Sequence, residues 1–155
     1  MALTLRRAAD ALTALRGLCG ALLVVWPSFG VLLVGVLTDW IDGPLARRAG
    51  ATARGARFDL EADSLLTLGA AVAATRVGGS TVLLVAPVLR YAVAALRARP
   101  LDNDGVRWDR ITGVAQMTVF AALLAAGPMR GLRYFGVPVS AARCAALLAQ
   151  AQRPR

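Results

Sequence analysis

The sequence predicts an all-α fold, an integral membrane bundle of six transmembrane helices that forms a single domain over residues 1–155. Apolar residues fill 57% of the positions, more than is usual for a soluble domain. They occur in long runs separated by short segments rich in glycine, proline and arginine, which is the pattern of a multi-pass membrane protein. The length of the chain is that of one domain.

Six apolar runs are long enough to be read as helices. The segment Trp26-Pro27-Ser28 forms a tight turn between the first two runs, and Gly78-Gly79 ends the third. Several runs are shorter than the ~20 residues that a perpendicular membrane helix needs, so we expect local thinning or polar ends in the interface. The predicted helices are 8–25, 29–47, 57–77, 81–96, 110–126 and 134–149, the last interrupted by Pro138 and Arg143.

The distribution of arginine predicts the orientation of the bundle. All 18 basic residues are arginine, and the formal net charge is +9. A cytoplasmic N-terminus leaves only Arg76, Arg130 and Arg133 in the opposite loops, so the positive-inside rule places both termini in the cytoplasm of a cell-membrane protein. Because the charges are spread among loops, they indicate topology and anionic lipid, not nucleic acid. The arginines on the cytoplasmic side are Arg6, Arg7, Arg47, Arg48, Arg54, Arg57, Arg97, Arg99, Arg107, Arg110, Arg153 and Arg155.

Four aspartates in the second and third runs predict a metal site. Asp39 and Asp42 are three residues apart, and Asp59 and Asp63 are four apart, so each pair lies on one helix face. An acidic residue at membrane depth costs about 2.5–3.5 kcal/mol, so four of them need a compensating partner. The chain has no histidine, and oxygen ligands suit Mg²⁺ or Mn²⁺. Opposed faces of the two helices would gather the four carboxylates around a divalent cation at the cytoplasmic side.

The same segment carries a family resemblance. The residues Asp39-Trp-Ile-Asp42-Gly43-Pro-Leu-Ala46-Arg47, followed by Gly55, Asp59 and Asp63, fill all eight positions of the pattern D-x2-D-G-x2-A-R … G-x3-D-x3-D. This pattern resembles the motif of the CDP-alcohol phosphatidyltransferase (CDP-alcohol phosphotransferase) family, and the surrounding hydropathy fits that family over nearly the whole chain. The resemblance implies a homodimeric membrane enzyme that carries two Mg²⁺ or Mn²⁺ ions.

The resemblance also implies an activity. A phosphatidyl group moves from CDP-diacylglycerol to an alcohol acceptor, and CMP is released. The stretch from Thr38 to Gly43, with the Ala-Arg-Arg that follows it, looks most like bacterial phosphatidylglycerophosphate or cardiolipin synthases. Glycerol 3-phosphate is therefore the favoured acceptor, and an inositol phosphate or another alcohol is the alternative.

Site residues follow from the motif positions. The resemblance implies that Asp39, Asp42 and Asp59 are metal ligands, and that Asp63 is the general base on the attacking hydroxyl while also contacting metal. It further implies that glycine and alanine let the nucleotide approach the helix backbone, and that the arginine fork pairs with phosphate. The nucleotide-binding residues expected on these grounds are Gly43, Ala46, Arg47 and Gly55.

Three further candidates lie outside the motif. Thr13 and Arg16 resemble the end of an N-x2-T-x2-R pattern of the family, with Asp10 in place of the asparagine, and Thr13 is a candidate nucleotide contact. Arg90 and Arg143 are intramembrane cations, hence functional candidates by default. By the same resemblance they are expected to bind a phosphate on the acceptor.

Each interpretation has a structural alternative. The aspartates can form an ion-pair network with arginines 47, 54 and 57, and Arg47 can be a topology charge alone. Gly43 and Gly55 can be small residues at helix crossings, and Thr13 an ordinary helix residue. Arg90 and Arg143 can snorkel or pair internally. For the whole chain the alternative is a metal-binding membrane protein without catalysis, such as a cation permease or a degenerate scaffold.

Overall fold

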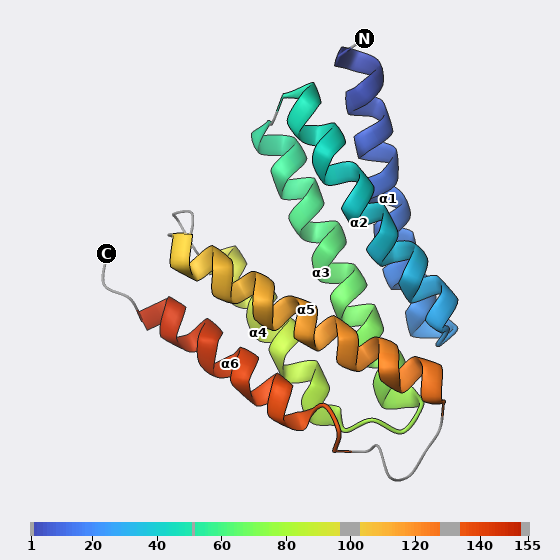
Figure 1. Cartoon of the computed structure of the whole chain (residues 1–155), viewed down its shortest axis with the longest axis vertical. Coiled ribbons are helices and arrows are strands. Elements are labelled where there is room, and N and C mark those ends of the chain that lie inside the picture. The colour runs from blue at the N-terminus through green and yellow to red at the C-terminus, as the bar shows by residue number, and fades with distance from the viewer. Residues whose placement is uncertain (1, 51, 97–102, 128–133, 153–155) are drawn as a thin grey trace. The chain divides into compact units, whose positions relative to one another are not determined.

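The computed structural model describes residues 2–50, 52–96, 103–127 and 134–152. Side chains are described for these residues except 2, 3, 43, 46, 47, 49, 53, 54, 94–96, 103–109 and 150–152. Within these ranges the chain forms six α-helices and one short 3₁₀ helix, and no strand (Figure 1). The predicted all-α class and the predicted number of helices are confirmed.

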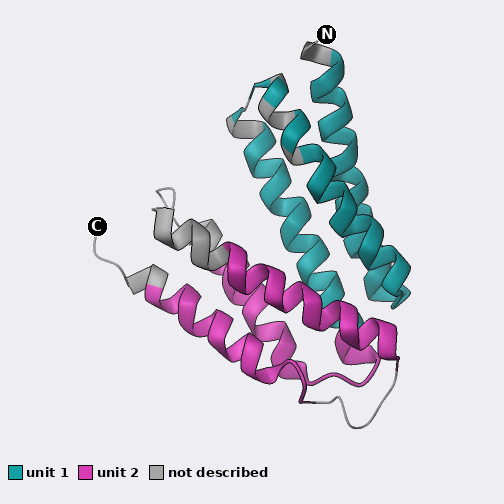
Figure 2. Cartoon of the chain, viewed as in Figure 1, with its two compact units in different colours: residues 1–73 teal, residues 74–155 magenta. Residues whose placement is uncertain are grey.

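Two compact units make up the chain, residues Met1–Ala73 and Ala74–Arg155 (Figure 2). Unit 1 contains α1 (Ala2–Val25), α2 (Phe29–Ala49) and nearly all of α3 (Ala53–Arg76). Unit 2 contains the 3₁₀ helix η1 (Thr81–Leu84), α4 (Val85–Leu96), α5 (Asn103–Ala126) and α6 (Val137–Gln152). The expectation of a single domain stays a prediction, because compact halves of a helical bundle are not in themselves separate domains.

Several predicted helix boundaries were wrong. The starts predicted at residues 8, 57 and 110 are too late, because α1, α3 and α5 begin at Ala2, Ala53 and Asn103. The additional turns are polar and arginine-rich, so hydropathy does not mark them although they continue the helix. The helix predicted from residue 81 begins as η1, where the Ser80 side chain accepts a hydrogen bond from the Val82 N–H at 3.3 Å.

The predicted start of the last helix was also wrong. Residues 134–136 form a turn in which the Val137 N–H donates to the Tyr134 carbonyl at 3.1 Å. Pro138 therefore lies in the first turn of α6, where the absent N–H costs no helical hydrogen bond. Pro138 was expected to interrupt this helix and instead marks its beginning.

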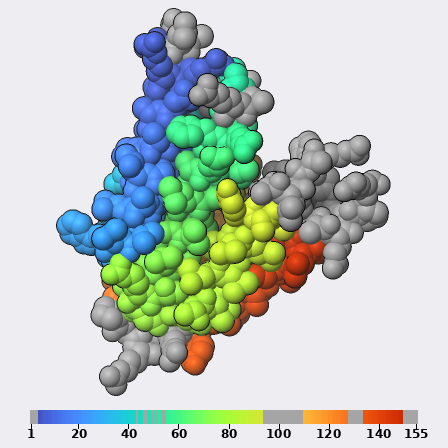
Figure 3. All heavy atoms as spheres, turned by 180° about the vertical axis from the view of Figure 1, so that it is seen from behind, coloured from blue at the N-terminus to red at the C-terminus, as the bar shows by residue number. Residues whose placement is uncertain are grey.

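Close backbone approach holds α1 against α3 in unit 1. A Cβ atom on Gly20 would lie 2.6 Å from the carbonyl carbon of Leu65, and one on Gly69 would overlap the carbonyl of Gly20. Small residues of this kind let membrane helices pack through their backbones. The space-filling view shows α3 directly against α1 (Figure 3). Glycine thus sets the distance between α1 and α3 at Leu65, which is two residues from Asp63.

The second helix of unit 1 packs on the same core. A Cβ atom on Gly35 would lie 2.6 Å from Leu66 of α3 and 3.3 Å from Cys19 of α1, so α2 contacts both other helices at this level. Farther along α2, Pro44 lies inside the helix and cannot donate a hydrogen bond to the turn before it. The helix ends at Gly50, whose φ of 85° few other residues tolerate.

Unit 2 has its own apolar core, which includes the buried side chains of Leu83, Phe120 and Leu123. A hydrogen bond from the Ser140 hydroxyl to the Val82 carbonyl, 3.2 Å long, joins α6 to η1. Gly136 lies against Leu83, with only 2.7 Å between its added Cβ and the Leu83 side chain. Ser140 is fully buried, so this contact also removes a polar group from an otherwise apolar interior.

Many large apolar side chains lie on the outer surface of the helices, among them Leu18, Trp26, Trp40 and Ile41 in unit 1 and Val114 in unit 2. An apolar surface this extensive is unusual for a soluble monomer. By length and composition alone, one helix of the described ranges, Thr4–Val25, is long and apolar enough to cross a membrane. The shorter apolar helices are Thr81–Val93, Arg110–Ala126 and Val137–Ala149.

Candidate functional site

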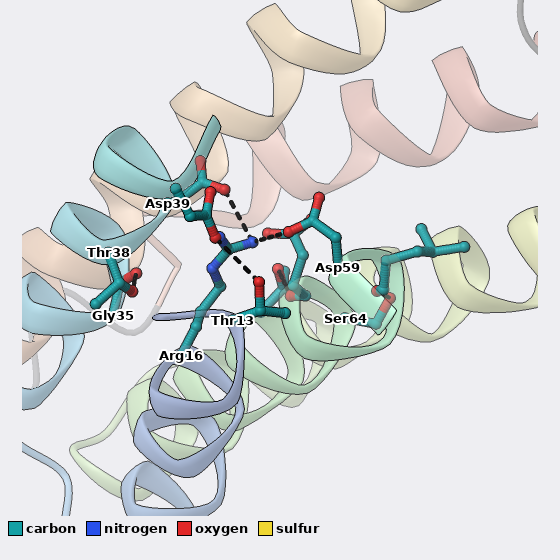
Figure 4. A network of polar contacts seen from close by, with 11 residues as sticks. Thr13, Arg16, Gly35, Thr38, Asp39, Asp59 and Ser64 are labelled. Carbon is teal, nitrogen blue, oxygen red and sulfur yellow. Dashed lines mark hydrogen bonds and ion pairs between the residues drawn. The ribbon is translucent and has the colours of Figure 1, made fainter. Parts of the chain in front are cut away.

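Three aspartates of unit 1 converge where α2 and α3 face each other. Asp39, Asp42 and Asp59 each offer a carboxylate oxygen, and these oxygens all lie within 4.8 Å of one another. Figure 4 shows Asp39 and Asp59 with Arg16 between them. We call these three residues the aspartate centre. The Asp42 side chain is buried, at 7% exposure, whereas those of Asp39 and Asp59 are about half exposed, at 50% and 53%. The centre is therefore closed on the Asp42 side and open on the other.

A single arginine from α1 reaches into the aspartate centre. The Arg16 side chain is fully buried, and its Nη1 lies 2.9 Å from Asp39 and 2.8 Å from Asp59. Its Nη2 pairs with Asp42. The three helices of unit 1 thus meet through one guanidinium, whose planar fork contacts three carboxylates at once.

Arg57 does not join this network. It pairs with Glu61 one turn along α3, at 3.2 Å, and its side chain is 82% exposed. The alternative to a metal site was an ion-pair network between the aspartates and arginines 47, 54 and 57. For Arg57 that alternative is wrong. The side chains of Arg47 and Arg54, the other two partners it named, lie outside the described residues.

Thr13 supports the centre from one turn before Arg16. Its hydroxyl donates to Asp42 Oδ2 at 3.3 Å, and its side chain is buried. The buried oxygen of Asp42 therefore receives donors from two residues of α1. The residue predicted to contact the nucleotide contacts a predicted metal ligand.

Asp63 lies on α3, one turn beyond Asp59, and is partly buried. It is not among the three aspartates whose oxygens lie within 4.8 Å. The structure thus gathers three of the four predicted carboxylates and places the fourth beside them.

The predicted nucleotide residues are only partly described. Gly43, Ala46 and Arg47 fall within α2, but their side chains lie outside the described part. Gly55 lies in the first turn of α3, where its N–H donates to the Thr52 hydroxyl at 3.2 Å, a helix N-cap. The one described atom near a Cβ added to Gly55 is that hydroxyl, at 3.1 Å. Among the described atoms, none from another helix lies within 4 Å of that Cβ position.

The predicted acceptor residues lie in unit 2. Arg90 on α4 is partly buried, and Arg143 on α6 is almost fully buried, at 3% exposure. The Arg143 guanidinium lies against the backbone of α5, since a Cβ on Gly113 would be 2.8 Å from Nη1. Gln116, one turn farther along α5, is 1% exposed, and neither of its side-chain amide atoms has a hydrogen-bond partner among the described residues. Buried polar groups of this kind normally find partners.

The donor set of the aspartate centre fits a hard divalent cation. All three groups are carboxylates, and their oxygens are already close together. Mg²⁺ and Mn²⁺ prefer such oxygen ligands. The open side, formed by Asp39 and Asp59, gives a cation and an anionic substrate access.

The chain was compared with models of known protein families. The model of the CDP-alcohol phosphatidyltransferases matches residues 6–148. The chain belongs to that family. No curated protein and no solved structure matches it.

As a CDP-alcohol phosphatidyltransferase family member, the chain is a membrane helical bundle and a transferase of phospholipid biosynthesis. The family transfers a phosphatidyl group from a CDP-alcohol to an alcohol acceptor. Its membrane location explains why large apolar side chains cover the outside of the helices.

Three candidate residues of this family member were not predicted as site residues. Arg16 is an intramembrane cation, and the rule that selected Arg90 and Arg143 would also have selected it. Gln116 and Gly113 follow Arg110 at helical spacing, but nothing in the sequence indicates that Gln116 is buried or that Gly113 lies against Arg143. Both features depend on how the helices pack.

Proposed function

We propose that this family member moves the phosphatidyl group of CDP-diacylglycerol to glycerol 3-phosphate and releases CMP, in a reaction that depends on Mg²⁺ or Mn²⁺. One observation carries the proposal: Asp39, Asp42 and Asp59 converge from two helices to within 4.8 Å, at the motif positions of a family that uses a CDP-linked donor. A purely structural ion-pair network has no need of a third carboxylate around one guanidinium.

The aspartate centre would hold the cation, with Asp63 contributing to a second ion beside it. A divalent cation held there would neutralise the pyrophosphate of the donor and would stabilise the charge that develops on the departing CMP. The protein residues position the reactants, and positioning with electrostatic stabilisation is most of what phosphoryl-type transfer requires.

Asp63 is the proposed general base. Its carboxylate takes the proton of the acceptor hydroxyl as that oxygen bonds to the phosphatidyl phosphorus, and the bond from this phosphorus to the CMP oxygen breaks. Its position supports this role, since it lies one turn from Asp59 yet outside the group of three converging carboxylates.

Nucleotide binding is assigned to Thr13, Gly43, Ala46, Arg47 and Gly55. Gly55 has the clearest support, because a side chain there would meet only the Thr52 hydroxyl among the described atoms. The absence of a side chain is then explained by a ligand that approaches the first turn of α3. Thr13 would act near the nucleotide through its bond to Asp42.

The acceptor phosphate is assigned to Arg143 on α6, with Arg90 on α4 as the second candidate. A guanidinium at 3% exposure suits a phosphate because it can offer two parallel hydrogen bonds away from water. Glycerol 3-phosphate and inositol phosphates share this group, so the acceptor assay must separate them.

The cellular arrangement is proposed from the arginine distribution. The chain would cross the cell membrane several times, with both termini and the aspartate centre at the cytoplasmic side, where CMP can leave. We also propose a homodimer, as the family resemblance implies, and no nucleic-acid partner.

Release of CMP from CDP-diacylglycerol tests this proposal. The purified protein would be assayed with Mg²⁺ or Mn²⁺ against glycerol 3-phosphate, inositol phosphate, inositol, serine and phosphatidylglycerol. Release that depends on both the cation and glycerol 3-phosphate is the expected result. CMP release with an inositol phosphate as the only effective acceptor would change the proposed acceptor but not the proposed type of reaction. Cation binding without CMP release from any pair would favour a non-catalytic metal-binding protein.

A further inference from the structure

We propose that Arg16 is a built-in counter-ion of the aspartate centre, and that a divalent cation binds all three carboxylates only by displacing its guanidinium. The inference rests on the metal binding proposed above and concerns what controls it. It assigns to Arg16 a positioning role, since it acts through the metal ligands.

The contacts of Arg16 are one-sided. Both terminal nitrogens contact the aspartate centre, Nη1 at 2.9 Å from Asp39 and 2.8 Å from Asp59, and Nη2 at Asp42. The Nε atom is buried and has no hydrogen-bond partner among the described residues. The guanidinium is therefore held by the three carboxylates that a metal would need.

The surroundings of Asp42 determine whether the Arg16 guanidinium and a metal ion can contact the aspartate centre at the same time. The half-exposed carboxylates of Asp39 and Asp59 have surface left for a cation. Asp42 is 7% exposed, and its Oδ2 already accepts from Arg16 and from Thr13. A cation that uses this oxygen must take the place of a donor. The Arg16 donor carries a positive charge and repels the cation, so it is the one that leaves.

Charge makes the exchange favourable. The three carboxylates carry one negative charge each, and Arg16 contacts all of them with a single positive charge. A dication carries twice the charge of a guanidinium, so the same carboxylates attract it more strongly. Because two ligands that compete for one site weaken each other reciprocally, removal of Arg16 must strengthen metal binding.

Mn²⁺ titration of Arg16→Met measures this competition directly. The electron paramagnetic resonance signal of free Mn²⁺ gives the Kd in detergent-purified protein without any substrate. We expect Arg16→Met to bind Mn²⁺ about tenfold more tightly than the unmodified chain. Weaker binding by the variant would overturn the proposal, because Arg16 would then be needed to hold the carboxylates in place for the metal.

Arg57→Met is the matched control. It also removes one arginine and one ion pair from unit 1, but Arg57 is 82% exposed and pairs with Glu61 outside the aspartate centre. Its Kd should stay within about twofold of the unmodified chain, as expected for a screened surface charge. Absence of Mn²⁺ binding in both the unmodified chain and Arg16→Met would be a different failure, that of the proposed metal site itself.

The proposal can still be tested if Arg16→Met folds poorly. Recovery of folded Arg16→Met only in the presence of Mn²⁺ supports the proposal, because the cation then replaces the guanidinium. If Arg16→Met cannot be recovered in folded form with or without Mn²⁺, Arg16→Lys is titrated in its place. Lysine keeps the charge but lacks the fork that bridges three carboxylates, so its Mn²⁺ affinity should exceed that of the unmodified chain. Equal or lower affinity would overturn the proposal.

Discussion

Replacing Gly20 with alanine is expected to separate α1 from α3 and to disable the aspartate centre without altering any of its residues. The added Cβ would lie 2.6 Å from the backbone of Leu65, where an ordinary contact begins at 3.4 Å. The obstacle is backbone, which cannot change rotamer to make room. The two helices must therefore move apart by about 0.8 Å, the difference between these two distances.

A displacement of this size is large for the site. Gly20 lies one helical turn from Arg16, and Leu65 lies two residues from Asp63. If the shift is passed on in full, the 2.8 Å contact between Arg16 and Asp59 lengthens to about 3.6 Å, which is no longer a hydrogen bond. Overpacking costs about 1–3 kcal/mol, of which the better helix propensity of alanine offsets up to about 1 kcal/mol.

The assay compares Gly20→Ala with Gly17→Ala, three residues earlier on the same helix. A Cβ at Gly17 meets Ala62 and Leu65 at 3.9 Å, an ordinary contact, so this variant gains helix propensity without a clash. We expect Gly20→Ala to lower both Tm and CMP release, and Gly17→Ala to leave both unchanged or slightly raised. Equal behaviour of the two variants would refute the claim that backbone contact between α1 and α3 sets the geometry of the centre.

Three further predictions concern the residues of the reaction. Asp63→Asn should lower kcat for CMP release by about 10²–10⁴-fold, the usual contribution of a general base, while Tm changes little; full activity would remove the general-base assignment. Removal of divalent ions with EDTA should abolish CMP release, and added Mg²⁺ or Mn²⁺ should restore it; activity that persists in EDTA would exclude metal dependence. Arg143→Met should raise KM for glycerol 3-phosphate and leave KM for CDP-diacylglycerol unchanged, whereas the exposed control Arg110→Met should change neither; a rise for both substrates would indicate general damage to unit 2.

The aspartate centre was predictable because its residues are spaced regularly. The spacing of Asp39 and Asp42 on one helix and Asp59 on the next is a local property, and two helical faces need only be opposed to bring them together. Helix type and number were predictable for a similar reason, since long apolar runs leave few alternatives. The ends of α1, α3 and α5 were not, because their polar first turns carry no hydropathy signal.

Contacts that depend on helix rotation could not be predicted. Arg16 bridges three aspartates only because one particular face of α1 meets α2 and α3, and the backbone contact between Gly20 and Leu65 fixes that face. Hydropathy does not specify this rotation, because the outer faces of the helices are as apolar as the inner ones. The contact between Arg143 and Gly113 could not be predicted from the sequence for the same reason.

The most direct test of this account is an experimental structure with Mn²⁺ and a CDP-linked lipid, using the anomalous signal of manganese to locate the ion. We predict an anomalous peak within coordination distance of Asp39, Asp42 and Asp59, with the donor pyrophosphate beside it. A peak elsewhere, or three carboxylates that are dispersed when substrate is bound, would contradict the account.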